Sequence, residues 1–123
     1  MAKKKVSRKN TKKKVAAPAK RFSVYVIELD QAVLKSKRFR DKNPDHDPEK
    51  PCFYVGMTAR TPQERFEQHM RGHKSGRYVR KHGKYLRRRL FNRYNPMTYE
   101  DAVAKEPWLA RLLRERGHGV WQN

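Results

Sequence analysis

The sequence predicts an α+β domain in which a small antiparallel sheet of about three strands is flanked by helices. Two short runs rich in β-branched and aromatic residues, 22–29 and 52–56, predict strands. Two capping signals, TPQE at 61–64 and TYED at 98–101, predict where helices begin. With 123 residues the chain has room for one small domain, which we place at residues 22–123.

The two predicted strands, FSVYVIEL and CFYVG, are expected to pair as a hairpin with a long connection. That connection, residues 30–51, is polar and holds three prolines, so we expect it to be an insertion loop. A short helix between Val33 and Phe39 is compatible with its sequence.

The first helix is predicted from its capping residues. Thr61 supplies the N-cap, Pro62 suits the first helical position, and Glu64 completes a capping box. We expect the helix to reach about Arg71 and to end at Gly72.

The same helix should present two stripes of side chains. Phe66 and Met70 are spaced by four residues and are expected to face the core, while Arg65 and His69 share a neighbouring stripe.

The second half of the chain predicts shorter elements. Residues 76–83 form at most a short helix, and residues 84–91 suit an edge strand. The TYED signal begins a helical region that runs to Arg116, with Pro107 expected to kink or split it. The tail GVWQ suits either a final strand or a packed end.

The charge of the chain restricts its partners. It carries 32 Lys and Arg against 12 Asp and Glu, a net charge of +20, so we expect nucleic acid rather than a membrane as the partner. Residues 1–21 hold ten of these cations and no acid, which predicts a disordered basic arm. Ribosomal proteins share this composition, so charge alone does not separate them from nucleases.

The compartment is predicted from what the sequence lacks. No apolar run is long enough to span a bilayer, and the N-terminus has no signal-peptide core. The single cysteine, Cys52, permits no internal disulfide and suits a reducing compartment. We expect a cytoplasmic, nucleoid-associated protein that acts as a monomer.

A band of basic residues between Arg71 and Arg93 holds ten Lys and Arg and no acid. Such side chains make phosphate contacts, so we assign nucleic-acid binding to the central cations of the band, Lys74, Arg77, Arg80, Lys81, Lys84 and Arg87. Four aromatic residues interrupt the band, and they either stack on bases or belong to a small core: Tyr78, Tyr85, Phe91 and Tyr94.

Metal ligands are scarce in this sequence. The histidines are scattered and one cysteine cannot build a zinc cluster, so no structural zinc site is predicted. Magnesium needs only one or two carboxylates with water and substrate phosphate, and Glu106 is a candidate beside the packed face of the last helix. Judged from the residues alone, a surface glutamate is the simpler interpretation of Glu106.

Polar residues converge where the second strand turns into the first helix. Tyr54 and Gly56 end the strand, and the glycine leaves room above the sheet. Tyr25 lies on the strand expected to pair with it, and Arg65 and His69 project from the helix. Each residue alone is explained by structure, but together they can line one concave site.

The combination resembles the GIY-YIG nuclease superfamily, and in particular its small single-domain bacterial members. The resemblance rests on SVY at 23–25, YVG at 54–56, Arg65 nine residues past the glycine, and His69 one turn later. The glutamate expected on the last helix matches Glu106 in KEPWLARLLRERGHGVWQN. The resemblance covers about residues 22–123, so only the basic arm lies outside it.

The sequence departs from the family pattern at three points. Ser23 stands where glycine is usual, and 28 residues separate Tyr25 from Tyr54, which makes residues 30–51 an insertion. Pro107 directly follows Glu106 and bears on the direction of its carboxylate.

The resemblance implies a divalent-metal-dependent endonuclease that hydrolyses phosphodiester bonds in DNA, with structure-dependent or low sequence specificity. Glu106 would hold Mg²⁺ or Mn²⁺, and Arg65 would bind the phosphate. Tyr54 or Tyr25 would activate water with help from His69, provided that nearby cations lower the phenol pKa. The alternative is a catalytically inactive protein that binds DNA, or RNA on the ribosome.

Overall fold

The computed structural model describes residues 18–122, and in it the domain is α+β, as predicted. The predicted basic arm, residues 1–21, lies outside the described residues except for its last four. A four-stranded sheet with the order β3-β1-β2-β4 forms the centre. Its strands are β1 (Ser23–Leu29), β2 (Cys52–Thr58), β3 (Gly83–Leu86) and β4 (Gly119–Gln122).

The sheet is mixed rather than purely antiparallel, which corrects the prediction. Strand β1 pairs antiparallel with β2, as the hairpin prediction required, and it also pairs antiparallel with β3. The tail forms β4, which pairs parallel with β2. A parallel neighbour needs a long crossover connection, and the segment between β2 and β4, which ends in helix α5, provides it.

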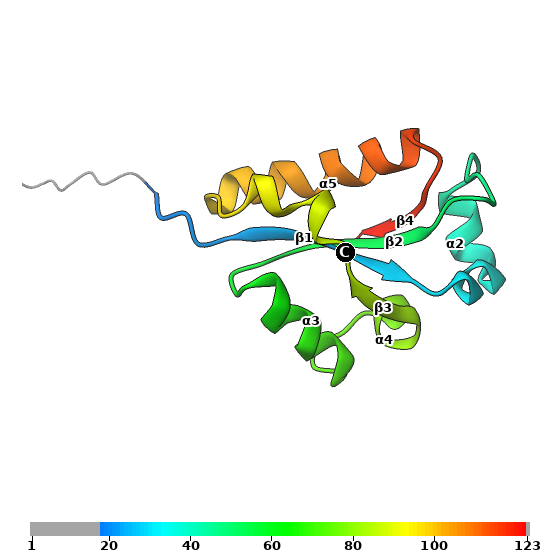
Figure 1. Cartoon of the computed structure of the whole chain (residues 1–123), viewed down its shortest axis with the longest axis horizontal. Helices are drawn as coiled ribbons and strands as arrows, with labels where there is room; N and C mark the ends of the chain where they lie inside the picture. Colours follow the sequence, from blue (N-terminus) through cyan, green and yellow to red (C-terminus); the bar gives the residue numbers. More distant parts are fainter. Residues whose placement is uncertain (1–17, 123) are drawn as a thin grey trace, which may run out of the picture.

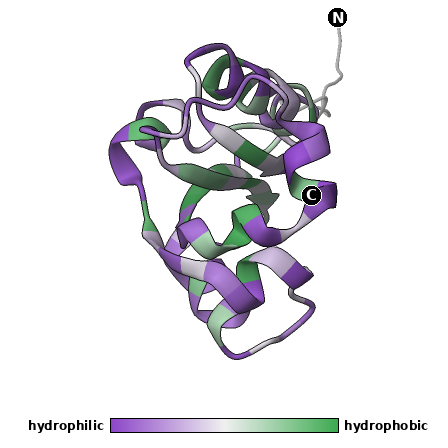
Figure 2. Ribbon diagram, turned by 90° about the vertical axis from the view of Figure 1, so that its right-hand side faces the viewer, coloured by the Kyte–Doolittle hydropathy of each residue, from purple (hydrophilic) through white to green (hydrophobic). Residues whose placement is uncertain are grey.

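Helices and short 3₁₀ turns lie on both sides of the sheet. Figure 1 shows α5 on one side of β1 and β2, and α3 and α4 on the other. Their bounds are η2 (Gln31–Lys35), α2 (Lys37–Lys42), α3 (Pro62–Met70), α4 (Arg77–His82), η3 (Arg88–Leu90), η4 (Asn92–Tyr94) and α5 (Tyr99–Glu115). In Figure 2 the hydrophobic residues concentrate on the central strands and the hydrophilic residues on the surrounding elements.

The segment 30–51 is more ordered than the predicted loop. It contains η2 and α2, and the Ser36 side chain accepts a hydrogen bond from the Phe39 amide at the start of α2. Phe39 is fully buried and its ring packs against those of Tyr78 and Trp121. The segment therefore supplies part of the core.

Helix α3 begins as predicted, with the Thr61 and Glu64 capping box formed. The expectation that Met70 faces the core is wrong, since its side chain is 41% exposed. Met70 lies over Gly83 of the edge strand β3, where solvent reaches it. His69 is fully buried instead, and Phe66 packs against the core from a partly buried position.

Helix α5 runs unbroken from Tyr99 to Glu115, so Pro107 does not split it. Proline removes the hydrogen bond to the carbonyl four residues earlier, that of Val103. Val103 is exposed, where water can satisfy that carbonyl. Buried residues on both sides of the proline, including Ala102 and Leu109, hold the two halves on the sheet.

Strand β3 is an edge strand, as predicted, but it ends at Leu86 and the 3₁₀ turn η3 follows. Of the four aromatic residues in the basic band, Tyr78 and Phe91 are buried in the core, whereas Tyr85 is 49% exposed. Within residues 18–122, none of the helices combines the length and the apolar character needed to cross a membrane.

Candidate active site

The pairing of β1 with β2 places Tyr25 directly opposite Gly56. Both tyrosines, Tyr25 and Tyr54, are buried on the side of the sheet that α3 covers. A Cβ atom at Gly56 would lie 2.4 Å from the Tyr25 hydroxyl oxygen and 2.6 Å from Cζ. Glycine is therefore needed at this position because the Tyr25 ring lies against the backbone there.

A chain of hydrogen bonds runs from Tyr25 through His69 to Ser75. The Tyr25 hydroxyl lies 2.8 Å from His69 Nε2, and His69 Nδ1 lies 3.0 Å from Ser75 Oγ. Since Ser75 Oγ donates to the Gly76 carbonyl, it accepts from His69 Nδ1–H, and Nε2 accepts from the phenol. The geometry thus assigns a neutral imidazole with its proton on Nδ1.

The electrostatics of His69 agree with this tautomer. Burial, followed by the positive charge of Arg65, lowers the pKa of His69 to about 4. His69 is therefore uncharged at neutral pH and orients the Tyr25 phenol rather than lowering its pKa. Ser75, which fixes the tautomer, was not predicted from the sequence, because a serine in a polar loop has no distinguishing pattern.

Arg65 reaches from α3 to the loop that carries Ser75. Its Nη1 donates to Gln68 Oε1 and to the His73 carbonyl at 3.1 Å each, and its Nη2 donates to the Lys74 carbonyl at 2.9 Å. A guanidinium has five N–H groups. Three of these groups are used in the hydrogen bonds above, and the guanidinium also forms a hydrogen bond with Tyr25, which opposes the rise in the pKa of that phenol. The positive charge of Arg65 therefore lies beside the Tyr25 phenol, where it suits a bound phosphate.

Both phenols are protonated at neutral pH. Burial raises the pKa of Tyr54 to about 12, and the opposing effect of Arg65 is smaller. Burial also raises the pKa of Tyr25, and the neighbouring Tyr54 adds to the increase. A tyrosine that acts as a base needs a lowered pKa, whereas the protein groups alone raise the pKa of both phenols. The pKa of Tyr54 is raised less than that of Tyr25, so Tyr54 is the easier phenol to ionise.

Glu106 is buried in α5 with its side chain only 9% exposed, so the interpretation as a surface glutamate is wrong. Its carboxylate makes no hydrogen bond or ion pair with any residue in the described part of the chain. Burial raises the pKa of Glu106 to about 7. Its charge also raises the pKa of Tyr25 and of Tyr54, which places it in the electrostatic environment of the phenols.

Residues 18–122 contain no cluster of three or more His, Cys, Asp or Glu side chains that would hold a metal ion. Magnesium does not require such a cluster, because it can be held by one carboxylate with water and substrate oxygens. A buried carboxylate without a partner is costly unless something neutralises it. Glu106 therefore fits a divalent cation that is completed by water and phosphate.

The predicted nucleic-acid-binding cations do not all have the same surroundings. Five of them are exposed on and around α4 and β3: Lys74, Arg77, Arg80, Lys81 and Lys84. Arg87 instead pairs with Glu28 at 2.7 Å and lies over the Phe53 ring. Arg77 and Lys81 meet Lys35 of η2 around a pocket of about 430 Å³, so the segment 30–51 adds a cation to this surface.

The structure brings Tyr25, Tyr54, Arg65 and His69 together and places Glu106 nearby on the opposite helical layer. No protein-family model matches the sequence, and neither the curated proteins nor the solved structures provide a match.

Proposed function

We propose that this protein is a divalent-metal-dependent endonuclease of the GIY-YIG type that hydrolyses phosphodiester bonds in DNA. The observation that carries the proposal is the Glu106 carboxylate, which is buried without a partner in residues 18–122 and raises the pKa of two neighbouring phenols. A protein that only binds nucleic acid gains nothing from this costly arrangement. A phosphodiesterase needs a carboxylate and a hydroxyl at one site.

Each residue has a role that its surroundings support. Glu106 would hold Mg²⁺ or Mn²⁺, which when bound offsets negative charge on the phosphate and lowers the pKa of nearby groups. Arg65, whose guanidinium lies beside Tyr25, would pair with the phosphate. Tyr54 serves as the base, because the Tyr25 hydroxyl already donates to His69.

The substrate follows from charge and from shape. Exposed cations on α4 and β3 bind the phosphate backbone without reading sequence, as expected for a chain with a net charge of +20. We expect selectivity for DNA structure or low sequence specificity. The protein would act as a monomer in the cytoplasm, associated with the nucleoid.

The alternative is a catalytically inactive protein that binds DNA or ribosomal RNA. It is favoured by the two raised phenol pKa values, which show that the protein groups alone do not activate either tyrosine. Binding would then depend on salt but not on Mg²⁺ or on Glu106.

Cleavage assays separate the two functions. Supercoiled, branched and single-stranded DNA would be incubated with Mg²⁺, with Mn²⁺ or with EDTA. We expect metal-dependent nicking by the wild type, and a loss of at least about a hundredfold for Arg65→Ala, as for removal of a transition-state donor. Tyr54→Phe, which keeps the ring, should also be inactive. Activity that survives both substitutions would exclude the proposed site.

A further inference from the structure

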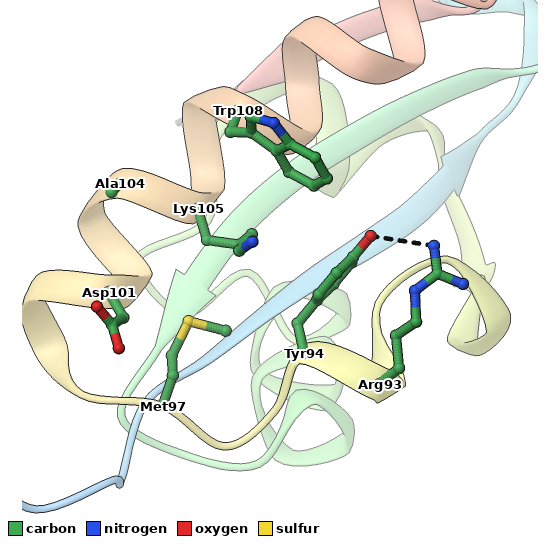
Figure 3. Close-up of a pocket in the computed structure, with 7 residues that line it drawn as sticks. All are labelled: Arg93, Tyr94, Met97, Asp101, Ala104, Lys105 and Trp108. Atoms are coloured by element: carbon green, nitrogen blue, oxygen red, sulfur yellow. Dashed lines mark hydrogen bonds between the residues drawn. The ribbon is translucent and has the colours of Figure 1, made fainter.

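A second pocket lies on the opposite flank of α5 from Glu106. It has a volume of about 560 Å³, and α5 and η4 form its walls (Figure 3). The α5 wall is a stripe at helical spacing, formed by Asp101, Ala104, Lys105 and Trp108. Glu106 belongs to the buried stripe on the other flank of α5.

Two aromatic rings form a corner of this pocket. The rings of Tyr94 and Trp108 have centroids 5.7 Å apart and planes at 85°. Trp108 is 37% exposed, which is unusual for so large an apolar side chain in a domain with a small core. The part of the indole that remains exposed can therefore be covered by a flat molecule.

Two cations lie against the same rings. Lys105 Nζ is 4.3 Å from the Trp108 centroid and 4.7 Å from the Tyr94 centroid. The Arg93 guanidinium is 5.0 Å from the Tyr94 centroid and donates to the Tyr94 hydroxyl at 3.0 Å. These two cations outnumber Asp101, the one acid that lines the pocket, so the pocket favours a negatively charged ligand over a positively charged one. A small anion without a flat face would leave the rings uncovered.

A ligand that contacts both the aromatic rings and the cations would have a flat ring and a negatively charged group beside it. A nucleotide meets this description, because its base stacks on aromatic rings and its phosphate pairs with cations. A base inside a duplex is already stacked on its neighbours, so only an unpaired base can present its face to Trp108.

We propose that this pocket binds an unstacked nucleobase of a single-stranded segment, with Trp108 as the stacking surface and Arg93 and Lys105 as phosphate contacts. What the pocket implies for cleavage rests on the proposed nuclease function. One helix diameter, about 10–12 Å, separates the two flanks of α5. The captured base therefore lies only a few nucleotides from the bond to be cut, and flapped or branched DNA is the substrate class.

The test measures binding without cleavage. The full-length protein in EDTA would be titrated into labelled oligonucleotides at one fixed salt concentration. The probes are a single strand, a blunt duplex of the same sequence, and the single strand with abasic positions. The variants are Trp108→Ala, Trp108→Phe, which retains a stacking ring, and Tyr99→Ala. Tyr99 is an exposed aromatic control on the same helix that does not line the pocket.

Base stacking is worth about 1–3 kcal/mol by alanine substitution, so Trp108→Ala should weaken single-strand binding by about fivefold to about 150-fold. Duplex binding should change less than about twofold. Trp108→Phe and Tyr99→Ala should stay near the wild type, and abasic positions should weaken binding to the wild type. Equal effects of Trp108→Ala on strand and duplex, or no effect of abasic positions, would overturn the proposal.

The two proposals fail in different ways. Single-strand binding that depends on Trp108, without metal-dependent cleavage of any substrate, would reject the nuclease and keep the nucleobase pocket. Cleavage that requires Glu106 but is insensitive to Trp108 on a flapped substrate would reject the pocket and keep the nuclease. A protein that binds none of the probes would overturn both.

Discussion

Replacing Gly56 with alanine is expected to disturb both the fold and the site, because Gly56 lies beneath the Tyr25 ring. The new Cβ would be 2.4 Å from the Tyr25 hydroxyl oxygen, whereas ordinary contact begins at 3.4 Å, so the ring must move by about 1 Å. Tyr25 is 1% exposed and its hydroxyl is hydrogen-bonded to His69, so the ring has little room to move.

Two costs follow from this displacement. Overpacking a core costs about 1–3 kcal/mol, and a buried polar group that loses its hydrogen bond costs about 1–3 kcal/mol more. We expect Gly56→Ala to lower the free energy of unfolding by about 2–6 kcal/mol, a large part of the roughly 5–15 kcal/mol that holds a domain together. Urea unfolding followed by circular dichroism would measure the change.

Two further variants test the cause. At Gly76 an added Cβ would meet Tyr54 only at 3.9 Å, so Gly76→Ala should change stability by less than about 1 kcal/mol. Combining Gly56→Ala with Tyr25→Leu, which removes the ring, should cost less than the two single changes together. Gly56→Ala with wild-type stability, or strictly additive costs in the double variant, would refute the packing of Tyr25 on Gly56.

Three other predictions follow from the described contacts. Ser75→Ala removes the hydroxyl that accepts a hydrogen bond from His69 Nδ1–H, an interaction worth about 1 kcal/mol. Cleavage should therefore slow about fivefold in Ser75→Ala and remain near normal in Ser75→Thr. Unchanged ¹⁵N shifts of the imidazole in Ser75→Ala would contradict the assigned tautomer. Because burial raises the pKa of Glu106 from 4.5 to about 7, this carboxyl favours folding below pH 4.5 and loses that contribution as the pH rises through 7. Glu106→Gln should therefore stabilise the metal-free protein above pH 7 by up to about 3 kcal/mol relative to the wild type in urea titrations, and an equal difference at pH 4 and pH 8 would count against it. Replacing Arg77 and Lys81 with alanine should reduce the salt dependence of duplex DNA binding by about 1.8 in the logarithmic slope, and an unchanged slope would exclude phosphate contacts at this pocket.

Local signals in the sequence predicted the elements that position the site. The Thr61 and Glu64 capping box placed the start of α3, and the β-branched runs placed β1 and β2, because these features depend on neighbouring residues. The parallel pairing of β4 was not predicted, because it depends on how a long connection returns the chain to the sheet.

The same distinction holds for side chains. Tyr25, Tyr54, Arg65 and His69 could be predicted as a cluster from strand pairing and helical spacing. The burial of Glu106, the role of Ser75 and the pocket at Trp108 depend on how α5 and the loops pack in three dimensions. Residue pattern alone carries little information about such packing.

The most direct test of the central claim compares the wild type with Glu106→Gln in two measurements on the same plasmid DNA. We predict that the variant loses Mg²⁺-dependent nicking while its DNA binding in EDTA, measured at matched salt, stays within about twofold of the wild type, because the carboxylate would serve the metal rather than the phosphate backbone. Nicking by Glu106→Gln at the wild-type rate would contradict the claim that this buried carboxylate is the centre of a phosphodiesterase site.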